Sequence, residues 1–150
     1  MDIPSPARIM VELQKAATLG HRLLLQSPLG PLVSTTPFGR FLILHTTGRR
    51  TGQLRKTPLS YIKDGDTYIV IASDGGSPHH PDWYLNLLEG PDAEVDVGGR
   101  RSQVHAETVT GEERERLWRQ AVAAYAGYAG YQARTDRQIP VVRLSPTTST

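Results

Sequence analysis

The segment TTGRRTGQLRK, residues 46–56, concentrates positive charge in a turn that contains glycine. Its basic residues are Arg49, Arg50, Arg55 and Lys56, and two glycines bracket the first pair. The guanidinium group of arginine presents paired N–H donors that match the oxygens of a phosphate or a carboxylate, and glycine lets a ligand approach the backbone amides. The turn is therefore a candidate site for an anionic ligand, although a solvated turn whose charges only aid solubility has the same composition.

The segment IASDGGSPHHPDWYLNL, residues 71–87, contains a second candidate site. Ser73, Gly75 and Gly76 stand between an apolar strand and the start of a helix. Glycine-rich turns and helix N-termini both favour anions, while a flexible loop is the alternative interpretation. The two adjacent histidines of this segment point in different directions, and no third ligand is nearby in the sequence, so we predict no metal site.

A cluster of tyrosines forms the third candidate site. Tyr125, Tyr128 and Tyr131 recur at every third residue of the segment YAGYAGY, so they follow one broad side of a helix or of its frayed end. Tyrosines at this spacing most often contribute to packing. With small residues between them, three phenols could instead line a pocket for a flat ring, and one of them could donate a proton.

The overall composition narrows the classes of function. The chain has 150 residues, enough for one domain with a core, and its formal charge of +2 is too small for general nucleic-acid binding. The absence of cysteine excludes disulfides, thiolate metal sites and a cysteine nucleophile. We see no apolar run long enough to span a membrane and no secretory signal, so we expect a cytoplasmic protein.

Hydrophobic periodicity and turn residues predict the elements that position these three sites. We expect helices over residues 5–27, over residues 81–90 and from residue 110 onward, and strands over residues 41–48, 57–64, 68–72, 93–97, 100–109 and 139–145. The pairs Asp64-Gly65 and Gly98-Gly99 supply hairpin turns. Thr110 and Glu113 have the spacing of a capping box, and Pro58 should lie at a bulge or a sheet edge because it cannot donate a ladder hydrogen bond.

Six strands joined mostly by hairpins favour an α+β fold. We predict a mainly antiparallel six-stranded barrel with flanking helices. The expected organisation is an N-terminal helix at residues 1–27, the barrel domain at residues 28–146, and a disordered tail at residues 147–150. In the simpler interpretation the N-terminal helix packs on the domain; in the alternative it lies on a membrane surface and gives peripheral membrane association.

Taken together and in this order, several motifs resemble one family. The motifs are TTGRRTGQLRKTPL, IVIASDGG, HPDWYLNLLEGP and AAYAGYAGYQARTDRQIPVVRL, and they extend from about Phe41 to Pro146. They resemble the actinobacterial deazaflavin-dependent nitroreductase family, whose members use coenzyme F420. The resemblance implies a split β-barrel and a reductase that transfers a hydride from the reduced deazaflavin to an electron-poor acceptor, such as a quinone, an enone or a nitroaromatic.

The resemblance also implies a cofactor site. Coenzyme F420 carries a phosphodiester and a poly-glutamate tail, and members of the family hold this anionic chain with the basic turn. By this resemblance the cofactor-binding residues are Arg49, Arg50, Thr51, Gly52, Gln53, Arg55, Lys56, Thr57, Pro58, Ser73, Asp74, Gly75, Gly76, Trp83, Tyr84 and Asn86. The residues implied around the acceptor are Tyr125, Tyr128, Tyr131 and Ser73, with a phenol or the serine hydroxyl as the proton donor.

Two residues depart from the family pattern. An aromatic residue that often follows the PL of the basic strand is Ser60 here, and a lysine that is common before the glycine pair is Asp74. A carboxylate directed at an anionic tail would repel it, so Asp74 is expected to face the solvent or the substrate. Both differences affect the expected identity of the acceptor more than that of the cofactor.

Three other functions remain open from the sequence. A split-barrel oxidoreductase that uses FMN would need fewer basic residues than this turn provides, because FMN has one phosphate. A non-catalytic F420 carrier would have no need for the tyrosine cluster. Nucleic-acid binding is disfavoured by the near-neutral net charge. We therefore expect a small-molecule acceptor and no nucleic acid as partners, and the sequence does not indicate the oligomeric state.

Overall fold

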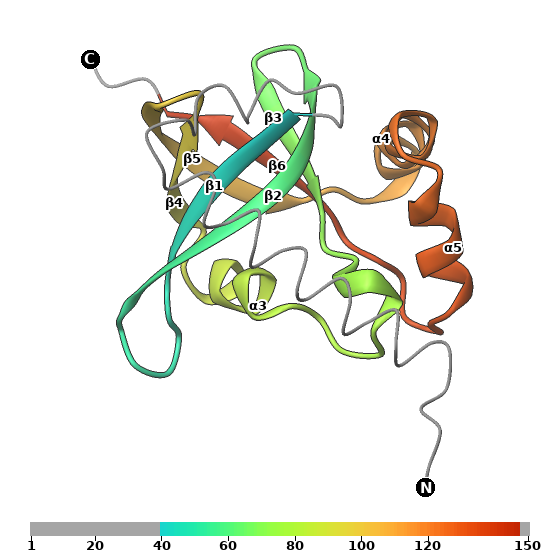
Figure 1. The fold of residues 1–150 in the computed structure, drawn as a ribbon, viewed down its shortest axis with the longest axis horizontal. Helices are drawn as coiled ribbons and strands as arrows, with labels where there is room; N and C mark the ends of the chain where they lie inside the picture. The colour runs from blue at the N-terminus through green and yellow to red at the C-terminus, as the bar shows by residue number, and fades with distance from the viewer. Residues whose placement is uncertain (1–39, 148–150) are drawn as a thin grey trace, which may run out of the picture.

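The computed structural model describes residues 40–147, which form a β-barrel with helices outside it (Figure 1). In chain order the elements are β1 (Arg40–Thr47), β2 (Leu54–Asp64), β3 (Thr67–Ile71), the 3₁₀ turn η1 (Asp74–Gly76), α3 (Asp82–Glu89), β4 (Asp92–Val97), β5 (Arg100–Thr108), α4 (Gly111–Ala124), α5 (Gly127–Ala133) and β6 (Val141–Pro146). The predicted N-terminal helix and its membrane contact lie outside the described residues. Within residues 40–147, no helix is long and apolar enough to cross a membrane.

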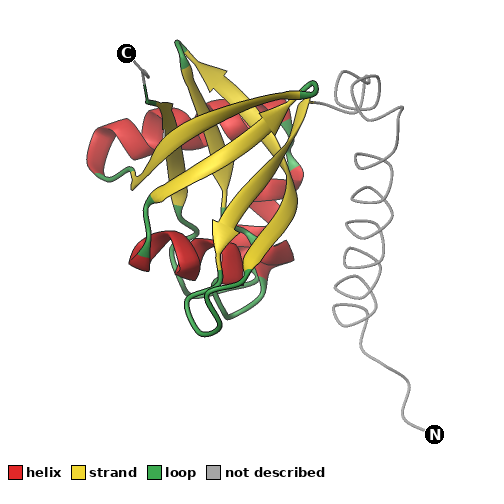
Figure 2. Cartoon of the chain, turned by 90° about the vertical axis from the view of Figure 1, so that its left-hand side faces the viewer, coloured by secondary structure: helices red, strands yellow, loops and turns green. Residues whose placement is uncertain are grey.

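The six strands close into a barrel in the order β1-β2-β3-β6-β5-β4. Every neighbouring pair within residues 40–147 is antiparallel, including the pair β1 and β4 that completes the closure. Figure 2 shows the strands wrapping around the core with the helices on the outside. The predicted α+β class and antiparallel barrel are confirmed.

Alternating side chains fill the barrel interior. Leu42 and Leu44 of β1 are almost completely buried there. The same interior cluster contains Val70, Ala72, Trp83, Tyr84, Leu87, Val95, Val104, Ala106, Val142 and Leu144. Three of these residues come from α3, so this short helix covers one end of the barrel (Figure 1).

Strand β3 is buried on both of its faces. Val70 belongs to the interior cluster. Ile69 and Ile71 face the other way and pack in a second cluster with residues of α4, including Leu117 and Ala121. This double burial explains the continuous apolar run of β3.

The β1–β2 hairpin extends further than predicted. Strand β2 begins at Leu54, so Arg55 and Lys56 lie within the strand and not in the turn. The next turn consists of Gly65 and Asp66, one residue later than the predicted pair, with the Gly65 φ at 60°. A glycine adopts this left-handed backbone without a steric penalty, which is why the two-residue turn forms there.

Within the described residues, Pro58 lies where β2 is paired with a neighbouring strand on one side only, which suits a residue without a backbone N–H. It pairs with Ile43 of β1. On its other side β2 pairs with β3 only at Ile62–Asp64, so Pro58 has one neighbouring strand within the described part of the chain. The prediction of an edge position is confirmed.

The single helix predicted from residue 110 is divided in two, which corrects that prediction. Tyr125 has an extended backbone with φ −147° and ψ 101°, and it ends α4. Its side chain folds over Gly127, where an added Cβ would lie 2.5 Å from the ring. Because Gly127 has no side chain, it leaves room for the Tyr125 ring. The chain changes direction here, and α5 begins at Gly127.

The predicted capping box is also wrong in its hydrogen bonds. Thr110 is the N-cap of α4, but its side chain makes no capping hydrogen bond. Glu113 instead forms ion pairs with Arg116 and Arg143, and both arginines also reach Asp64. Two arginines outcompete the weak backbone contact because charge-assisted hydrogen bonds are the stronger kind. This network joins α4 to β6 and to the β2–β3 turn.

At the C-terminal end, Thr147, the first residue of the predicted tail, is paired with β5. The Thr147 amide donates a hydrogen bond of 2.9 Å to the carbonyl of Gln103, which extends the pairing of β6 with β5. The remaining tail residues, 148–150, lie outside the described part of the chain.

Candidate functional site

The turn between β1 and β2 is held in shape by its own backbone. The Gly48 amide donates to the Gln53 carbonyl at 2.7 Å, and the Gly52 amide donates to the Gly48 carbonyl at 2.8 Å. Gly52 has a φ of 70°, a conformation that favours glycine. The hydroxyl of Thr51 accepts a further hydrogen bond from the Gln53 amide at 3.3 Å. The loop therefore presents its basic side chains from a defined frame.

Arg49 turns back from this loop onto helix α3. Its amide and its guanidinium both donate to Asn86 Oδ1, at 3.1 and 3.0 Å, and the guanidinium also reaches Asp82 at 3.2 Å. Asn86 donates in turn to the Thr46 hydroxyl at 3.3 Å. The Arg49 side chain is only 15% exposed. Arg49 and Asn86 therefore fasten the turn to α3.

The other three basic residues of the predicted cluster point outward, Arg50 from the turn and Arg55 and Lys56 from the start of β2. Arg50, Arg55 and Lys56 are exposed, and no other residue within 40–147 forms a hydrogen bond or an ion pair with their side chains. Charged groups in this state keep their full capacity to bind an anion. The structure thus divides the predicted basic cluster into one structural arginine and three outward-facing cations. Gly52 and Gln53 are exposed beside them, and Thr57 and Pro58 continue into β2.

The segment after β3 bends through several left-handed residues. Gly75 and Gly76 have φ angles of 64° and 82°, and Asp74 has a φ of 43°. A positive φ is uncommon for a residue with a side chain and is best tolerated by aspartate and asparagine. Ser73 is buried, and its carbonyl accepts the Gly76 amide at 2.9 Å. The exposed Asp74 side chain lies at the surface of this bend, as expected.

Helix α5 packs directly against this bend. Figure 1 shows η1 beside α5. A Cβ added to Gly76 would lie 2.6 Å from the Tyr131 carbonyl oxygen, so only glycine allows the approach. The glycine bend and the tyrosine segment are more than fifty residues apart in the sequence, yet they pack against each other.

The three tyrosines form one cluster. The Tyr125 and Tyr131 hydroxyls lie 3.0 Å apart in a hydrogen bond. The ring of Tyr128 lies edge-on to that of Tyr125, with centroids 5.1 Å apart, and 6.3 Å from that of Tyr131. Tyr125 is 51% exposed, whereas Tyr128 and Tyr131 are half-buried. The cluster therefore has an open side and a supported side.

Burial raises the pKa of two of the phenols, those of Tyr128 and Tyr131. It raises the pKa of Tyr128, although a hydrogen bond from the Ser60 hydroxyl acts in the opposite direction. Burial also raises the pKa of Tyr131, and the hydrogen bond with Tyr125 adds to this effect. Both side chains are consequently O–H donors at neutral pH, with no tendency to ionise. Ser60 reaches Tyr128 from β2, which places the first of the two departures from the family pattern at the tyrosine cluster.

The comparisons with known proteins agree with this arrangement. The family model of the F420H(2)-dependent quinone reductases matches residues 22–146. The chain belongs to this family. It is 47% identical over 107 residues to an F420H(2)-dependent quinone reductase of Mycobacterium tuberculosis, an alignment that covers 69% of this chain and 72% of the relative.

Solved structures support the same assignment. An F420-H2 dependent reductase described as FDR-A is 40% identical with a TM-score of 0.65, and the match covers 70% of this chain and 93% of that one. A chain described as a domain-swapped dimer is 34% identical with a TM-score of 0.67 and covers 89% of this chain and 99% of that one. The fold is the split β-barrel of these reductases, as the sequence predicted.

Two predicted cofactor residues of this family member lie inside the barrel. Trp83 and Tyr84 are each 7% exposed. The Tyr84 hydroxyl hydrogen bonds with that of Thr108 at 2.9 Å. Their side chains pack in the interior cluster and support α3, the helix that also carries Asp82 and Asn86, the partners of Arg49.

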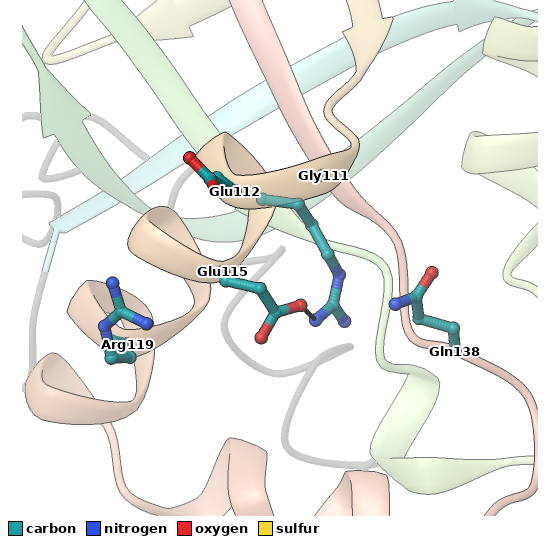
Figure 3. Close-up of a pocket in the computed structure, with 6 residues that line it drawn as sticks. Gly111, Glu112, Glu115, Arg119 and Gln138 are labelled. Atoms are coloured by element: carbon teal, nitrogen blue, oxygen red, sulfur yellow. Dashed lines mark hydrogen bonds and ion pairs between the residues drawn. The ribbon is translucent and has the colours of Figure 1, made fainter.

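A shallow pocket lies elsewhere on this reductase, beside the start of α4 (Figure 3). Its volume is about 660 Å³, and it is lined by Gly111, Glu112, Arg114, Glu115, Arg119 and Gln138. Arg114 is already engaged with Glu115 and with the Ile139 carbonyl, both at 2.8 Å. The pocket contains none of the predicted site residues.

Sequence reasoning missed Arg137, a residue of the segment between α5 and β6. Its guanidinium contacts the carbonyls of the bend after β3. A lone arginine in an irregular segment gives no pattern that would single it out, because its partners lie about sixty residues away in the chain.

Proposed function

We propose that this chain is an F420H2-dependent quinone reductase in which the basic turn holds the anionic tail of the cofactor and the tyrosine cluster faces the acceptor. The observation that carries the proposal is the set of three outward-facing cations, Arg50 in the turn and Arg55 and Lys56 at the start of β2, beside a turn whose frame is fixed to α3. A phosphodiester followed by glutamates matches such a cluster, since each unit of the tail carries a negative charge.

The bend after β3 supports the placement of the deazaflavin ring. Gly75 is half-buried and has no side chain, so a ligand could approach the backbone there, while the buried Gly76 packs against α5 on the other side. Ser73 lies at the start of the bend. We place the ring along this bend, between the basic turn and the tyrosines, with Gly75 and Asp74 at its edge.

The bound cofactor supplies a hydride to the acceptor. The chain's own residues position the acceptor, exclude water and provide a proton. A quinone that receives a hydride gains negative charge on one oxygen, and a protonated phenol beside that oxygen neutralises the charge as it forms. We assign this donor role to Tyr128 or Tyr131, and we assign Tyr125 to the orientation of the Tyr131 hydroxyl. Ser73 is the remaining candidate donor.

Ser60 bears on the choice of acceptor. It brings a small hydroxyl to Tyr128 at a position where the family often has an aromatic residue. The smaller side chain leaves more room beside the Tyr128 ring, so we expect quinones with a bulky ring substituent to be accepted. Enones and nitroaromatics are the wider acceptor class to be screened.

A direct test combines binding with turnover. The purified protein would be titrated with F420 and separately with FMN, and the reduced cofactor would then be offered to a series of quinones. Selective F420 binding with quinone-dependent oxidation of F420H2 is the expected result. Selective FMN binding would point to a flavin enzyme, and F420 binding without turnover of any acceptor would point to a carrier protein; either result would overturn the proposal.

A further inference from the structure

Arg137 makes an unusually complete set of contacts with one loop. Its Nε donates to the Ser77 carbonyl at 2.9 Å, and Nη2 donates to the Ser73 carbonyl at 2.8 Å. Nη1 donates to the Ala72 carbonyl at 3.2 Å and lies 3.0 Å from Nδ1 of His80. A guanidinium has five N–H donors in a rigid fork, and here the fork spans the segment from residue 72 to residue 80, called the glycine loop below.

The glycine loop is the segment in which we place the deazaflavin ring. Of the three carbonyls that accept from Arg137, that of Ser73 also accepts the Gly76 amide, whereas those of Ala72 and Ser77 would otherwise need solvent or another donor. One side chain satisfies all three and so sets the curvature of the loop. The positive φ angles of Gly75 and Gly76 lie between these anchor points.

The backbone of Arg137 is itself tied to the tyrosine helix. Gln132 of α5 donates its side-chain amide to the Arg137 carbonyl at 2.7 Å, and its Oε1 accepts the Ile139 amide at 2.9 Å. The same helix touches the loop through Tyr131, whose carbonyl faces Gly76. A continuous series of contacts therefore leads from the tyrosines, through Gln132 and Arg137, to the glycine loop.

The contact with His80 adds a condition. A guanidinium can only donate, so Nδ1 of His80 must accept, and the imidazole must then be neutral with its proton on Nε2. Among the described residues, the groups that face this ring are Arg137 from the α5–β6 segment and Tyr84 of α3, whose ring centroid is 5.0 Å away. A proton on Nδ1 would place two cations together and remove the hydrogen bond.

We propose that Arg137 is a positioning residue that holds the glycine loop against the tyrosine helix, and that this holding requires neutral His80. The inference rests on the proposed function, because it assumes that the glycine loop supports the cofactor ring. The inference adds that the position of the cofactor relative to the acceptor depends on Arg137, a residue that contacts neither of them.

The first test compares Arg137→Lys with Arg114→Lys. Arg114 is a matched control, since its side chain is 8% exposed and it also donates to a backbone carbonyl. Lysine keeps the charge but cannot span three carbonyls. We expect Arg137→Lys to raise the Kd for F420 by about tenfold or more, the loss expected from one or two charge-assisted hydrogen bonds, while Arg114→Lys leaves the Kd unchanged.

Hydrogen exchange on the cofactor-free protein gives an independent measurement. We expect the amides of the glycine loop to exchange about tenfold faster in Arg137→Lys than in the parent chain, with the exchange of the barrel strands unchanged. If both variants lose thermal stability equally and the loop amides keep their protection, Arg137 is merely structural and the inference is wrong. Failure of the parent chain to bind F420 would sink the proposed function, whereas the exchange result would still decide the role of Arg137.

The pH dependence of cofactor binding tests the condition on His80. Burial lowers the pKa of His80, and the nearby Arg137 charge lowers it further. We expect F420 affinity to be constant above about pH 6.5, the ordinary value of histidine, and to fall as His80 becomes protonated at lower pH. His80→Gln should remove this component, because a neutral amide oxygen can accept from Arg137 at any pH. An identical acid-side decline in both proteins would contradict the role of His80.

Discussion

The Gly76→Ala substitution tests whether the tyrosine helix and the glycine loop form one unit. The added Cβ would lie 2.6 Å from the Tyr131 carbonyl oxygen, 3.1 Å from the Tyr131 Cα and 3.2 Å from the Arg134 Cβ. Ordinary contacts begin at roughly 3.5 Å. Two of the three neighbours are backbone atoms, so they cannot move aside by a rotamer change, and the loop must separate from α5.

The cost of this substitution has two parts. The φ of 82° at Gly76 adds about 1–2 kcal/mol of backbone strain for a residue with a side chain, and the overlap adds about 1–3 kcal/mol. Gly65→Ala is the matched control, because Gly65 has a φ of 60° and no atom within 4 Å of an added Cβ. The control isolates the strain, so the difference between the two variants measures the contact with α5.

Thermal and urea unfolding would measure both variants. We expect Gly76→Ala to be less stable than Gly65→Ala by about 2 kcal/mol, or roughly 4–8 °C in Tm for a chain of this size. The F420 Kd should also rise in Gly76→Ala and stay unchanged in Gly65→Ala. Equal stability of the two variants, together with equal F420 affinity, would refute the claim that α5 supports the glycine loop.

Three further predictions concern other contacts of the site and the fold. Arg49→Ala should cost about 1–2 kcal/mol of stability because the part-buried hydrogen bonds to α3 are lost. Arg50→Ala should change stability by less than about 0.5 kcal/mol and yet weaken F420 binding. Urea unfolding would measure the effect on stability, and titration with F420 the effect on binding. Replacing Tyr128 and Tyr131 together by Phe should lower kcat with quinones about 100-fold at unchanged F420 affinity, and unaltered turnover would exclude both as proton donors. The pH profile of the wild-type kcat should show no ionisation of these phenols near pH 10, because their pKa values are raised. Hydrogen bonds from arginine lower the folded-state pKa of Asp64, so its contribution to stability is present above the ordinary carboxyl pKa and is lost as the pH falls through the lowered value; Asp64→Asn should flatten this acid dependence in urea unfolding, and an unchanged slope would contradict it.

The barrel could be predicted from the sequence because local signals agree with it. Period-two alternation, the apolar run of β3 and the glycine turns at 65 and 98–99 all favour short antiparallel strands. The tyrosine cluster was also found from its spacing. Where local signals are consistent with one another, the fold follows from them.

The remaining features depend on partners far away in the chain. Arg49 belongs to a basic cluster in the sequence, yet it is bound to α3 by residues 33 and 37 positions later. Glu113 has the spacing of a capping box but meets Arg143, 30 positions away. Arg137 has no local signal at all. Such pairings arise from the packing of distant elements, and nothing in the neighbouring sequence encodes them.

The central claim is that the outward-facing cations of the basic turn hold the cofactor tail, and one set of titrations tests it most directly. The Kd of F420 would be compared with that of a truncated deazaflavin that keeps the ring and ribityl chain but lacks the phosphodiester and glutamates, at low and high salt. The parent chain should bind F420 at least about tenfold more tightly than the truncated ring, and salt should weaken only the binding of F420. In a chain with Arg50→Gln, Arg55→Gln and Lys56→Gln, both the preference and its salt dependence should vanish. If the parent chain bound both ligands equally, or if the triple variant kept the preference for F420, the tail would be held elsewhere and the claim would be wrong.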